Sequence, residues 1–333
     1  MKRITVPALF VAAVFAVSSC LDPNVESASS ALNPTGAARD DAPIRACATM
    51  EVRDQQIKDN PGQAKKYEEV EAFTKKYVDN LAIQPSAVTS LTVTIPVVVH
   101  VLYNTAQENI SQAQIQSQID VLNKDFSNTN ADRTLLPGAF AGLAANMDIK
   151  FTLSSVDRKQ SNKTSWGTRD AMKSAKKGGI DPVDPSKFLN IWVCNIGGGI
   201  LGYAQFPGGS AATDGVVIGP QYFGNTGYVA APYDKGRTAT HEIGHWLNLR
   251  HIWGDASCGN DQVADTPTQQ TANYGCPSFP HVTCSNGPNG DLFMNYMDYT
   301  NDACMYMFTN GQKSRSQAIF AAGGARQSFA STL

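Results

Sequence analysis

The chain has 333 residues, of which 42% are hydrophobic and 17% are charged, and its formal net charge at pH 7 is -2. These values are typical of a globular protein with a large core. The chain has no basic stripe of the kind that binds nucleic acid, so we expect no nucleic-acid partner.

The N-terminus resembles an export signal. A basic start is followed by an apolar run from Val6 to Val17, which has the length of a signal-peptide core and is too short to span a bilayer. Small residues then precede Cys20, as in the lipobox of bacterial lipoproteins. We expect a signal peptide at 1–19 and a lipid on Cys20 that anchors the protein to the cell envelope, at the outer membrane or cell surface. The alternative is a plain secretory signal cut near Ser19, which gives a secreted protein.

Residues 20–45 are rich in Ser, Ala, Pro, Asn and Asp, which predicts a flexible tether. Two helical stretches follow within residues 46–88. The second has one apolar face, formed at steps of three and four by Tyr67, Val70, Phe73, Tyr77 and Leu81. The segment around Pro85 ends the pattern.

Strand and helix patterns alternate from about residue 89. Leu91–Tyr103 is rich in β-branched residues and predicts a buried strand, and Ser111 is a suitable N-cap for the helix that follows. The apolar stripe of that helix consists of Ile115, Ile119, Leu122 and Phe126. Further strands are predicted at 150–156, 189–194 and 215–218. This order predicts an α/β domain over residues 89–333, with a twisted, mostly parallel sheet backed by helices. The stretch 254–291 has no periodicity, which predicts an irregular region that is held together by covalent cross-links.

Three histidines and a glutamate form the decisive pattern. His241 and His245 are four residues apart, so on a helix they share one face and can hold one zinc ion. Glu242 lies further round the helix and can reach a water on the metal. His251 returns to the metal only if the helix ends near Asn248, which tolerates the left-handed conformation that such a turn needs. Three protein ligands and one open position are the layout of a catalytic zinc site.

This spacing resembles the zinc signature of the metzincins, which usually has Gly at the position of Asn248. The segment 241–255, HEIGHWLNLRHIWGD, resembles the pappalysin family (peptidase family M43, cytophagalysin-like branch), whose members often carry this Asn. The resemblance extends from about Cys47 to the C-terminus. It implies an α+β metzincin-like fold with an active-site helix, and a zinc endopeptidase made as a latent zymogen, with a prosegment at 46–88.

The segment Asn295–Tyr299 resembles the methionine turn of metzincins. By this resemblance, Met297 forms an apolar floor under the three imidazoles. Tyr299 matches a family tyrosine whose hydroxyl can donate to the developing oxyanion. In the implied mechanism, Glu242 takes a proton from a zinc-bound water, the hydroxide attacks the scissile carbonyl, and Glu242 returns the proton to the leaving amine.

The stretch 197–204 resembles the edge strand that pairs with extended peptide substrates in metzincins, and we expect Gly199, Leu201 and Tyr203 to bind substrate. The alternative is a flexible glycine loop. Asp302 lies just past the methionine turn and, as in some relatives, would favour Arg or Lys after the scissile bond. The alternative for Asp302 is a solvated loop acid.

The family pattern implies two disulfides, Cys258–Cys284 and Cys276–Cys304. Export also favours disulfides over a metal site. A second zinc ion on these four thiolates is the rival interpretation. Cys47 lies in an Arg-Ala-Cys element that resembles a cysteine switch, in which a thiolate occupies the open zinc position of the latent enzyme. The alternative is a Cys47–Cys194 disulfide.

Asp261, Asp265 and Thr266 resemble a calcium-binding loop of the family, and a loop with Asx turns and no ion is the alternative. We expect a monomer that acts on polypeptide substrates. The rival function is an inactive, zinc-stabilised binding or adhesion lipoprotein. The sequence argues against it, because a pure binding module has no need of Glu242.

Overall fold

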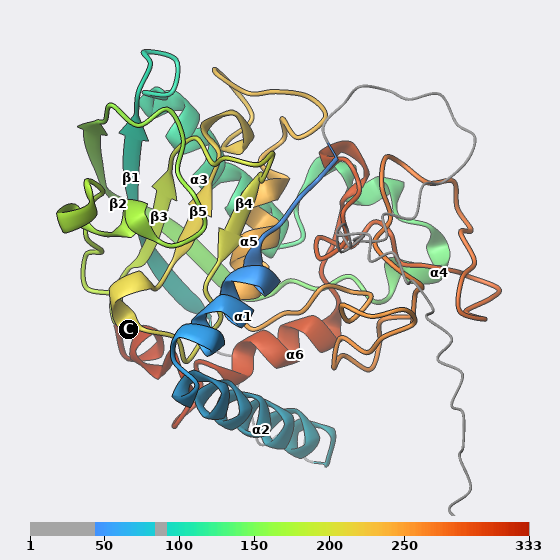
Figure 1. Ribbon diagram of the computed structural model, residues 1–333. Coiled ribbons are helices and arrows are strands. Elements are labelled where there is room, and N and C mark those ends of the chain that lie inside the picture. Colours follow the sequence, from blue (N-terminus) through green and yellow to red (C-terminus); the bar gives the residue numbers. More distant parts are fainter. Residues whose placement is uncertain (1–43, 84–91, 333) are drawn as a thin grey trace, which may run out of the picture. The chain divides into compact units, whose positions relative to one another are not determined.

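The computed structural model describes residues 44–83 and 92–332. Its α-helices are α1 (Thr49–Asp59), α2 (Gly62–Ile83), α3 (Gln112–Phe126), α4 (Gly138–Ala141), α5 (Arg237–Trp246) and α6 (Asn310–Ala318). Its strands are β1 (Val93–Tyr103), β2 (Ile149–Gln160), β3 (Leu189–Val193), β4 (Gly202–Ala204) and β5 (Val216–Ile218) (Figure 1). Short 3-10 helices occur at Ala131–Leu135, Ala171–Lys173, Ala175–Lys177, Ala211–Thr213, Pro220–Tyr222, Asp302–Cys304 and Gln327–Thr332.

The expected signal peptide, Cys20 and nearly all of the tether lie outside the described residues, as does Pro85. Within the two described ranges, none of the helices combines the length and the hydropathy that a membrane crossing requires.

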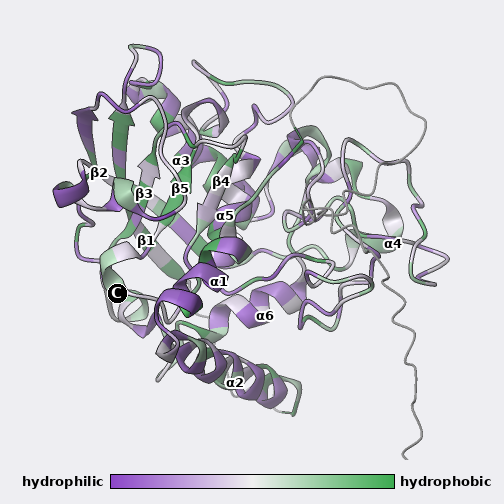
Figure 2. Cartoon of the chain, in the orientation of Figure 1, coloured by the Kyte–Doolittle hydropathy of each residue, from purple (hydrophilic) through white to green (hydrophobic). Residues whose placement is uncertain are grey.

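The strands form one sheet in the order β2-β1-β3-β5-β4. β1 pairs in parallel with β2 and β3, β3 pairs in parallel with β5, and β4 is antiparallel to β5 at the edge. The prediction of a mostly parallel sheet is therefore confirmed. The central strands are mostly apolar, as expected for strands that are covered on both faces, although β3 contains Asn190; β5 is green in Figure 2.

One face of the sheet packs against α3 and α5. The stripe predicted for α3 is buried together with Ile243 and Trp246 of α5. Ser111 caps α3 as predicted, since its hydroxyl accepts from the Gln114 N–H over 3.1 Å. The active-site helix is thus held between the sheet and the C-terminal part of the chain.

The opposite face of the sheet is covered partly by the N-terminal segment. Ala48 and Val52 share a buried cluster with Trp192 and Tyr203. α2 packs against α6 instead, and it is largely hydrophilic along its length (Figures 1 and 2). The region expected to be a prosegment therefore contacts the rest of the chain in two separate places.

The stretch 254–291 is irregular, as predicted. Two disulfides join Cys258 to Cys284 and Cys276 to Cys304 in this C-terminal region, which is the pairing that the family resemblance implies.

Candidate metal centre and active site

The active-site helix α5 ends in a turn that depends on Asn248. Asn248 has a φ of 72°, which is the left-handed conformation. The Asn248 N–H donates to the His245 carbonyl and the Leu249 N–H donates to the Gly244 carbonyl, each over 2.9 Å. This pair of bonds defines a Schellman cap, which closes the helix and reverses the chain. The cap brings His251 back to the face that carries the first two histidines.

The three imidazoles converge through their Nε2 atoms. His245 Nε2 lies 3.2 Å from His241 Nε2 and 3.1 Å from His251 Nε2. Each Nδ1 atom faces an acceptor: the Tyr296 carbonyl at 2.7 Å, the Leu249 carbonyl at 2.8 Å and Asp255 Oδ1 at 2.5 Å. These acceptors place the ring proton on Nδ1, so three Nε2 lone pairs point at one another.

This arrangement fits a zinc ion. Ligands about 2.0–2.1 Å from zinc at tetrahedral angles lie roughly 3.3 Å apart, close to the observed Nε2 separations. Burial lowers the pKa of His241 well below its usual range and that of His245 to about 3, and the neighbouring histidines add to both effects. Both imidazoles are therefore neutral, which is the form that binds a metal. Three convergent lone pairs without a cation between them would repel one another.

Cys47 supplies a fourth donor atom. Its Sγ and one ring nitrogen from each of the three histidines all lie within 4.8 Å of one another. The thiol is buried and free, and so is that of Cys194, which lies in the cluster on the other face of the sheet. The structure therefore does not contain the alternative Cys47–Cys194 disulfide. Burial, followed by the charge of Glu242, raises the pKa of Cys47 well above its usual range, whereas a bound cation would deprotonate it.

Glu242 is enclosed by the N-terminal segment. Its Oε2 atom accepts from the Thr49 hydroxyl over 2.9 Å and from the Cys47 thiol over 3.3 Å. Burial raises the pKa of Glu242 to about 7, and these two hydrogen bonds oppose the shift. A side chain at Gly202 would meet Glu242 Cγ at 2.9 Å, so glycine is needed there. No local sequence pattern marks Thr49, because it contacts a residue 193 positions away.

Met297 packs beneath the helix. A Cβ atom at Gly244 would collide with the Met297 sulfur, which explains the glycine between Glu242 and His245. The Tyr299 ring lies 5.6 Å from that of His241 and 5.0 Å from that of His251, between centroids.

The Tyr299 hydroxyl donates to the Cys47 carbonyl over 3.4 Å. Burial and then the charges of Cys47 and Glu242 raise the pKa of Tyr299. The phenol therefore stays protonated and remains a hydrogen-bond donor at the site.

Asp302 is not a solvated loop acid, because it is fully buried. Its Oδ1 atom pairs with Arg45 Nη2 over 2.5 Å, and its Oδ2 atom accepts from the N–H groups of Lys235 and Arg237 at the start of α5. Arg45 also donates to the Thr238 hydroxyl and the Thr300 carbonyl, each over 3.3 Å. The guanidinium thus occupies a closed, acidic pocket.

The Tyr233 ring faces the same guanidinium, with a distance of 4.8 Å from the ring centroid to Arg45 Cζ. The sequence indicated Asp302 as an acid that would favour Arg or Lys, but no local pattern marks Arg45 as its partner beyond its position two residues before Cys47.

The edge strand β4 pairs with the N-terminal segment through its main chain. The Leu201 N–H donates to the Ala46 carbonyl over 2.9 Å, and the Gly202 carbonyl accepts from Ala48 over 3.2 Å. The Tyr203 side chain is buried in the cluster with Trp192, and its hydroxyl donates to Asp170 Oδ1 over 3.0 Å. Gly199 precedes β4 and has a φ of 73°.

The geometry does not support calcium at the loop expected to bind it. Asp265 caps α6 by accepting from Thr309 over 2.7 Å and from Gly311 over 2.8 Å. The Asp261 carboxylate accepts from the Thr266 hydroxyl over 2.9 Å and is therefore already hydrogen-bonded within the loop. In the described ranges, the Cys47 and histidine group is the one set of three or more His, Cys, Asp or Glu side chains that could share an ion.

Comparisons with known proteins agree with this site. The model of the peptidase M43 family, described as pregnancy-associated plasma protein-A, matches residues 176–321. An extracellular metalloprotease of Pyricularia oryzae is 34% identical over 236 residues, which are 68% of this chain and 75% of that protein. One from Arthroderma benhamiae is 33% identical over 262 residues, which are 73% of this chain and 78% of that protein.

Solved structures of mirolysin from Tannerella forsythia are also similar. Mature mirolysin in complex with a cleaved peptide is 49% identical with a TM-score of 0.70, and the match covers 72% of this chain and 95% of that chain. A promirolysin mutant is 44% identical with a TM-score of 0.78, and the match covers 86% of this chain and 97% of that chain.

The fold, the histidine triad and these relatives define a metalloprotease, which acts on polypeptides. Within that class, the chain belongs to the peptidase M43, or pappalysin, family.

Proposed function

We propose that the chain is an exported, metzincin-type zinc endopeptidase made as a latent zymogen. Residues 1–19 are the signal peptide, 20–45 the tether, 46–88 the prosegment and 89–333 the catalytic domain, with a lipid on Cys20. The word extracellular in the names of the fungal relatives supports export. The match to promirolysin covers 86% of this chain and that to mature mirolysin covers 72%, which supports a removable segment before the catalytic domain.

The proposed site has zinc on His241, His245 and His251, which would polarise the scissile carbonyl and lower the pKa of water at the site. Glu242 takes a proton from the attacking water and later gives it to the leaving amine. Tyr299 donates a hydrogen bond to the carbonyl oxygen as negative charge develops there. Met297 supports the histidines from below the helix.

Latency in this proposal follows from the position of Cys47. Its sulfur is the fourth member of the donor group, so it excludes water from the open metal position. Glu242 cannot act as a base while it accepts hydrogen bonds from the N-terminal segment. Removal of the prosegment would free the metal position and the base in one step.

The preferred substrate in this proposal has arginine beside the scissile bond. Arg45 supports this, because its guanidinium is held by Asp302, Thr238 and Thr300 only two residues from Cys47. An arginine of a substrate would find the same partners once the prosegment has left. The edge strand, through Leu201 and Gly202, would pair with the substrate main chain.

The rival function, an inactive zinc-stabilised adhesion lipoprotein, explains fewer of these features. A binding protein needs neither a buried carboxylate beside the donor group nor a segment that covers it. The observation that carries the endopeptidase proposal is the convergence of Cys47, the three histidines and Glu242 in one buried cluster.

The proposal is tested on the full chain, before and after prosegment removal. We expect about one zinc per molecule and cleavage of an unfolded protein only after removal, with loss of cleavage on chelation. Glu242→Ala should retain the zinc and lose the cleavage. Undiminished cleavage by that variant would contradict the role of Glu242, and a zinc-free active protein would contradict the metal centre.

A further inference from the structure

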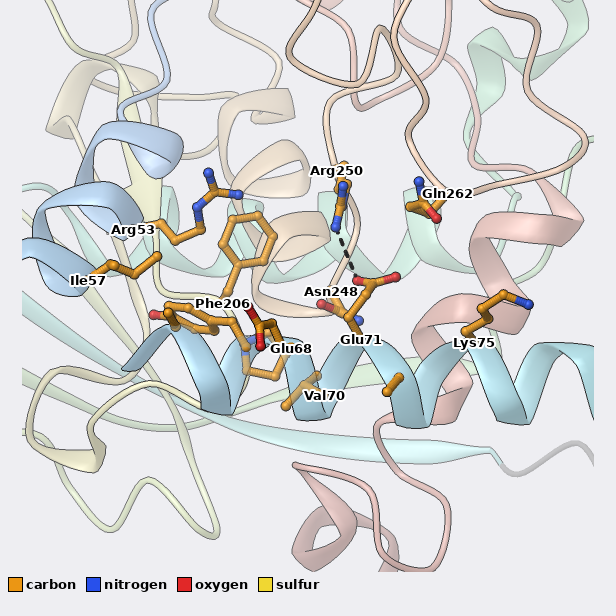
Figure 3. A pocket seen from close by; sticks show the side chains of 14 residues that line it. Arg53, Ile57, Glu68, Val70, Glu71, Lys75, Phe206, Asn248, Arg250 and Gln262 are labelled. Atoms are coloured by element: carbon orange, nitrogen blue, oxygen red, sulfur yellow. Dashed lines mark hydrogen bonds and ion pairs between the residues drawn. The ribbon is translucent and has the colours of Figure 1, made fainter. Parts of the chain in front are cut away.

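A second charged contact between the N-terminal segment and the catalytic domain lies on α2. Glu71 Oε1 accepts from Arg315 Nη1 over 2.7 Å and Glu71 Oε2 accepts from Arg315 Nη2 over 2.5 Å. Arg250 Nη2 lies 3.4 Å from the same Oε2 atom (Figure 3). One carboxylate of the segment is therefore held by two guanidinium groups of the catalytic domain.

Arg315 is anchored by the catalytic domain itself. It is only 3% exposed, and its Nε atom donates to the Asn248 carbonyl over 2.7 Å. Because this anchor does not involve the N-terminal segment, the Arg315 guanidinium keeps its position when Glu71 leaves with α2. Arg250 lies between the Schellman cap and His251 in the sequence, so its backbone is held beside the metal site. Both guanidinium groups then lack the carboxylate that they bind in the full chain.

Arg250 borders a cavity of about 480 Å³, and Phe206 lines the same cavity from the catalytic domain (Figure 3). Ile57 and Val70 line it from α1 and α2. The Phe206 ring contacts that of His245, with 5.5 Å between centroids. Arg250 therefore shares a cavity with a side chain that packs against a proposed zinc ligand.

We propose that Arg250 and Arg315 form a carboxylate-binding subsite of the activated enzyme, which binds an acidic side chain of a polypeptide substrate. This inference rests on the proposed peptidase function. The N-terminal segment occupies both charged sites, with Arg45 at Asp302 and Glu71 at the arginine pair.

The test uses the full chain after prosegment removal and peptides that carry one fixed arginine. Glu and Gln are compared at successive positions on each side of the scissile bond, since they differ only in charge. We expect kcat/KM to be roughly fivefold higher for Glu than for Gln at one or two of these positions, mainly through KM. The difference should shrink at high salt, because the ion pair is partly exposed.

Arg250→Gln should bring the Glu-to-Gln ratio close to one, and Arg250→Glu should shift the preference to a Lys peptide. Arg133→Gln, which removes an exposed positive charge elsewhere, serves as the control and should keep the ratio. Equal cleavage of Glu and Gln peptides by the wild-type enzyme overturns the subsite, and so does a ratio that Arg250→Gln leaves unchanged. If an Arg250 variant does not fold, the wild-type series and its salt dependence decide the question. Absence of cleavage of every peptide would instead overturn the proposed peptidase function.

Discussion

The Thr49 hydroxyl donates to Glu242 Oε2 over 2.9 Å and accepts from the Ala204 N–H over 2.8 Å. A single side chain of the N-terminal segment is thus hydrogen-bonded both to the buried carboxylate and to a backbone N–H group of the edge strand. An active peptidase of the proposed kind needs the first group for proton transfer and the second for substrate. Thr49 therefore blocks the site independently of the sulfur of Cys47.

Thr49→Val should weaken latency. The substitution keeps the shape of the side chain but removes a hydrogen bond to a charged group, which typically contributes about 1.5–3 kcal/mol. We expect roughly tenfold more peptidase activity from the uncleaved full chain, and the measurement is the initial rate before any processing. Thr49→Ser keeps the hydroxyl and should remain as latent as the wild type. A Thr49→Val chain that is fully latent would show that Cys47 suffices.

Asp302→Asn should abolish the preference of the activated enzyme for arginine. The pocket is closed and its acid fully buried, so a guanidinium without its counter-charge loses several kcal/mol there. We expect kcat/KM for an arginine peptide to fall by at least about tenfold. A citrulline peptide, which has nearly the same shape without the charge, is the control. An equal loss for both peptides would mean that Asp302 acts only through the start of α5, where it caps Lys235 and Arg237.

Gly244→Ala should destabilise the protein, because the new methyl group collides with the Met297 sulfur. Overpacking of a buried site of this kind costs about 1–3 kcal/mol. The change is measured as the free energy of unfolding in urea. Gly167→Ala is the matched control, since nothing lies within 4 Å of its added Cβ. Adding Met297→Ala to Gly244→Ala should lessen the clash, and a double variant as unstable as the sum of both changes would contradict this explanation.

Loss of the Cys276–Cys304 disulfide should loosen the Asp302 pocket as well as the fold. The bond links two cysteines that are 28 positions apart in the sequence, and Cys304 lies two positions after Asp302. Removing a disulfide of this kind typically costs about 2–5 kcal/mol. We expect the Cys276→Ser/Cys304→Ser chain to lose selectivity for arginine over citrulline. The Cys258→Ser/Cys284→Ser chain, whose bond lies elsewhere in the irregular region, should lose stability but keep the selectivity.

Metal removal should lower the melting temperature of the full chain, because His245 Nε2 lies only 3.2 Å from His241 Nε2 and 3.1 Å from His251 Nε2, and the three lone pairs need a cation between them. Free zinc at a thousand times its dissociation constant stabilises the folded chain by about 4 kcal/mol. The measurement is thermal unfolding with and without a chelator, together with zinc content. Cys47→Ala should show a smaller shift, since it removes one donor. An identical shift in both chains would argue against Cys47 as a ligand.

The local sequence predicted most strands of the sheet, helices α3 and α5, and the histidines that we propose as metal ligands. Ser111 and the apolar stripe after it predicted the start and the buried face of α3, and the spacing of His241, His245 and Asn248 predicted a helix that ends in a left-handed turn. These features follow from backbone geometry over a few residues, and periodicity in the sequence reports such geometry directly.

Only the tertiary structure decided which groups meet at the site. Thr49 reaches Glu242, and Arg45 reaches Asp302 across 257 positions, without any local pattern that marks either contact. Tyr203 faces inward and Asp265 caps a helix, although each fitted a family motif. Such contacts depend on how whole elements pack against one another, and many residue types are compatible with each position until that packing fixes its neighbours.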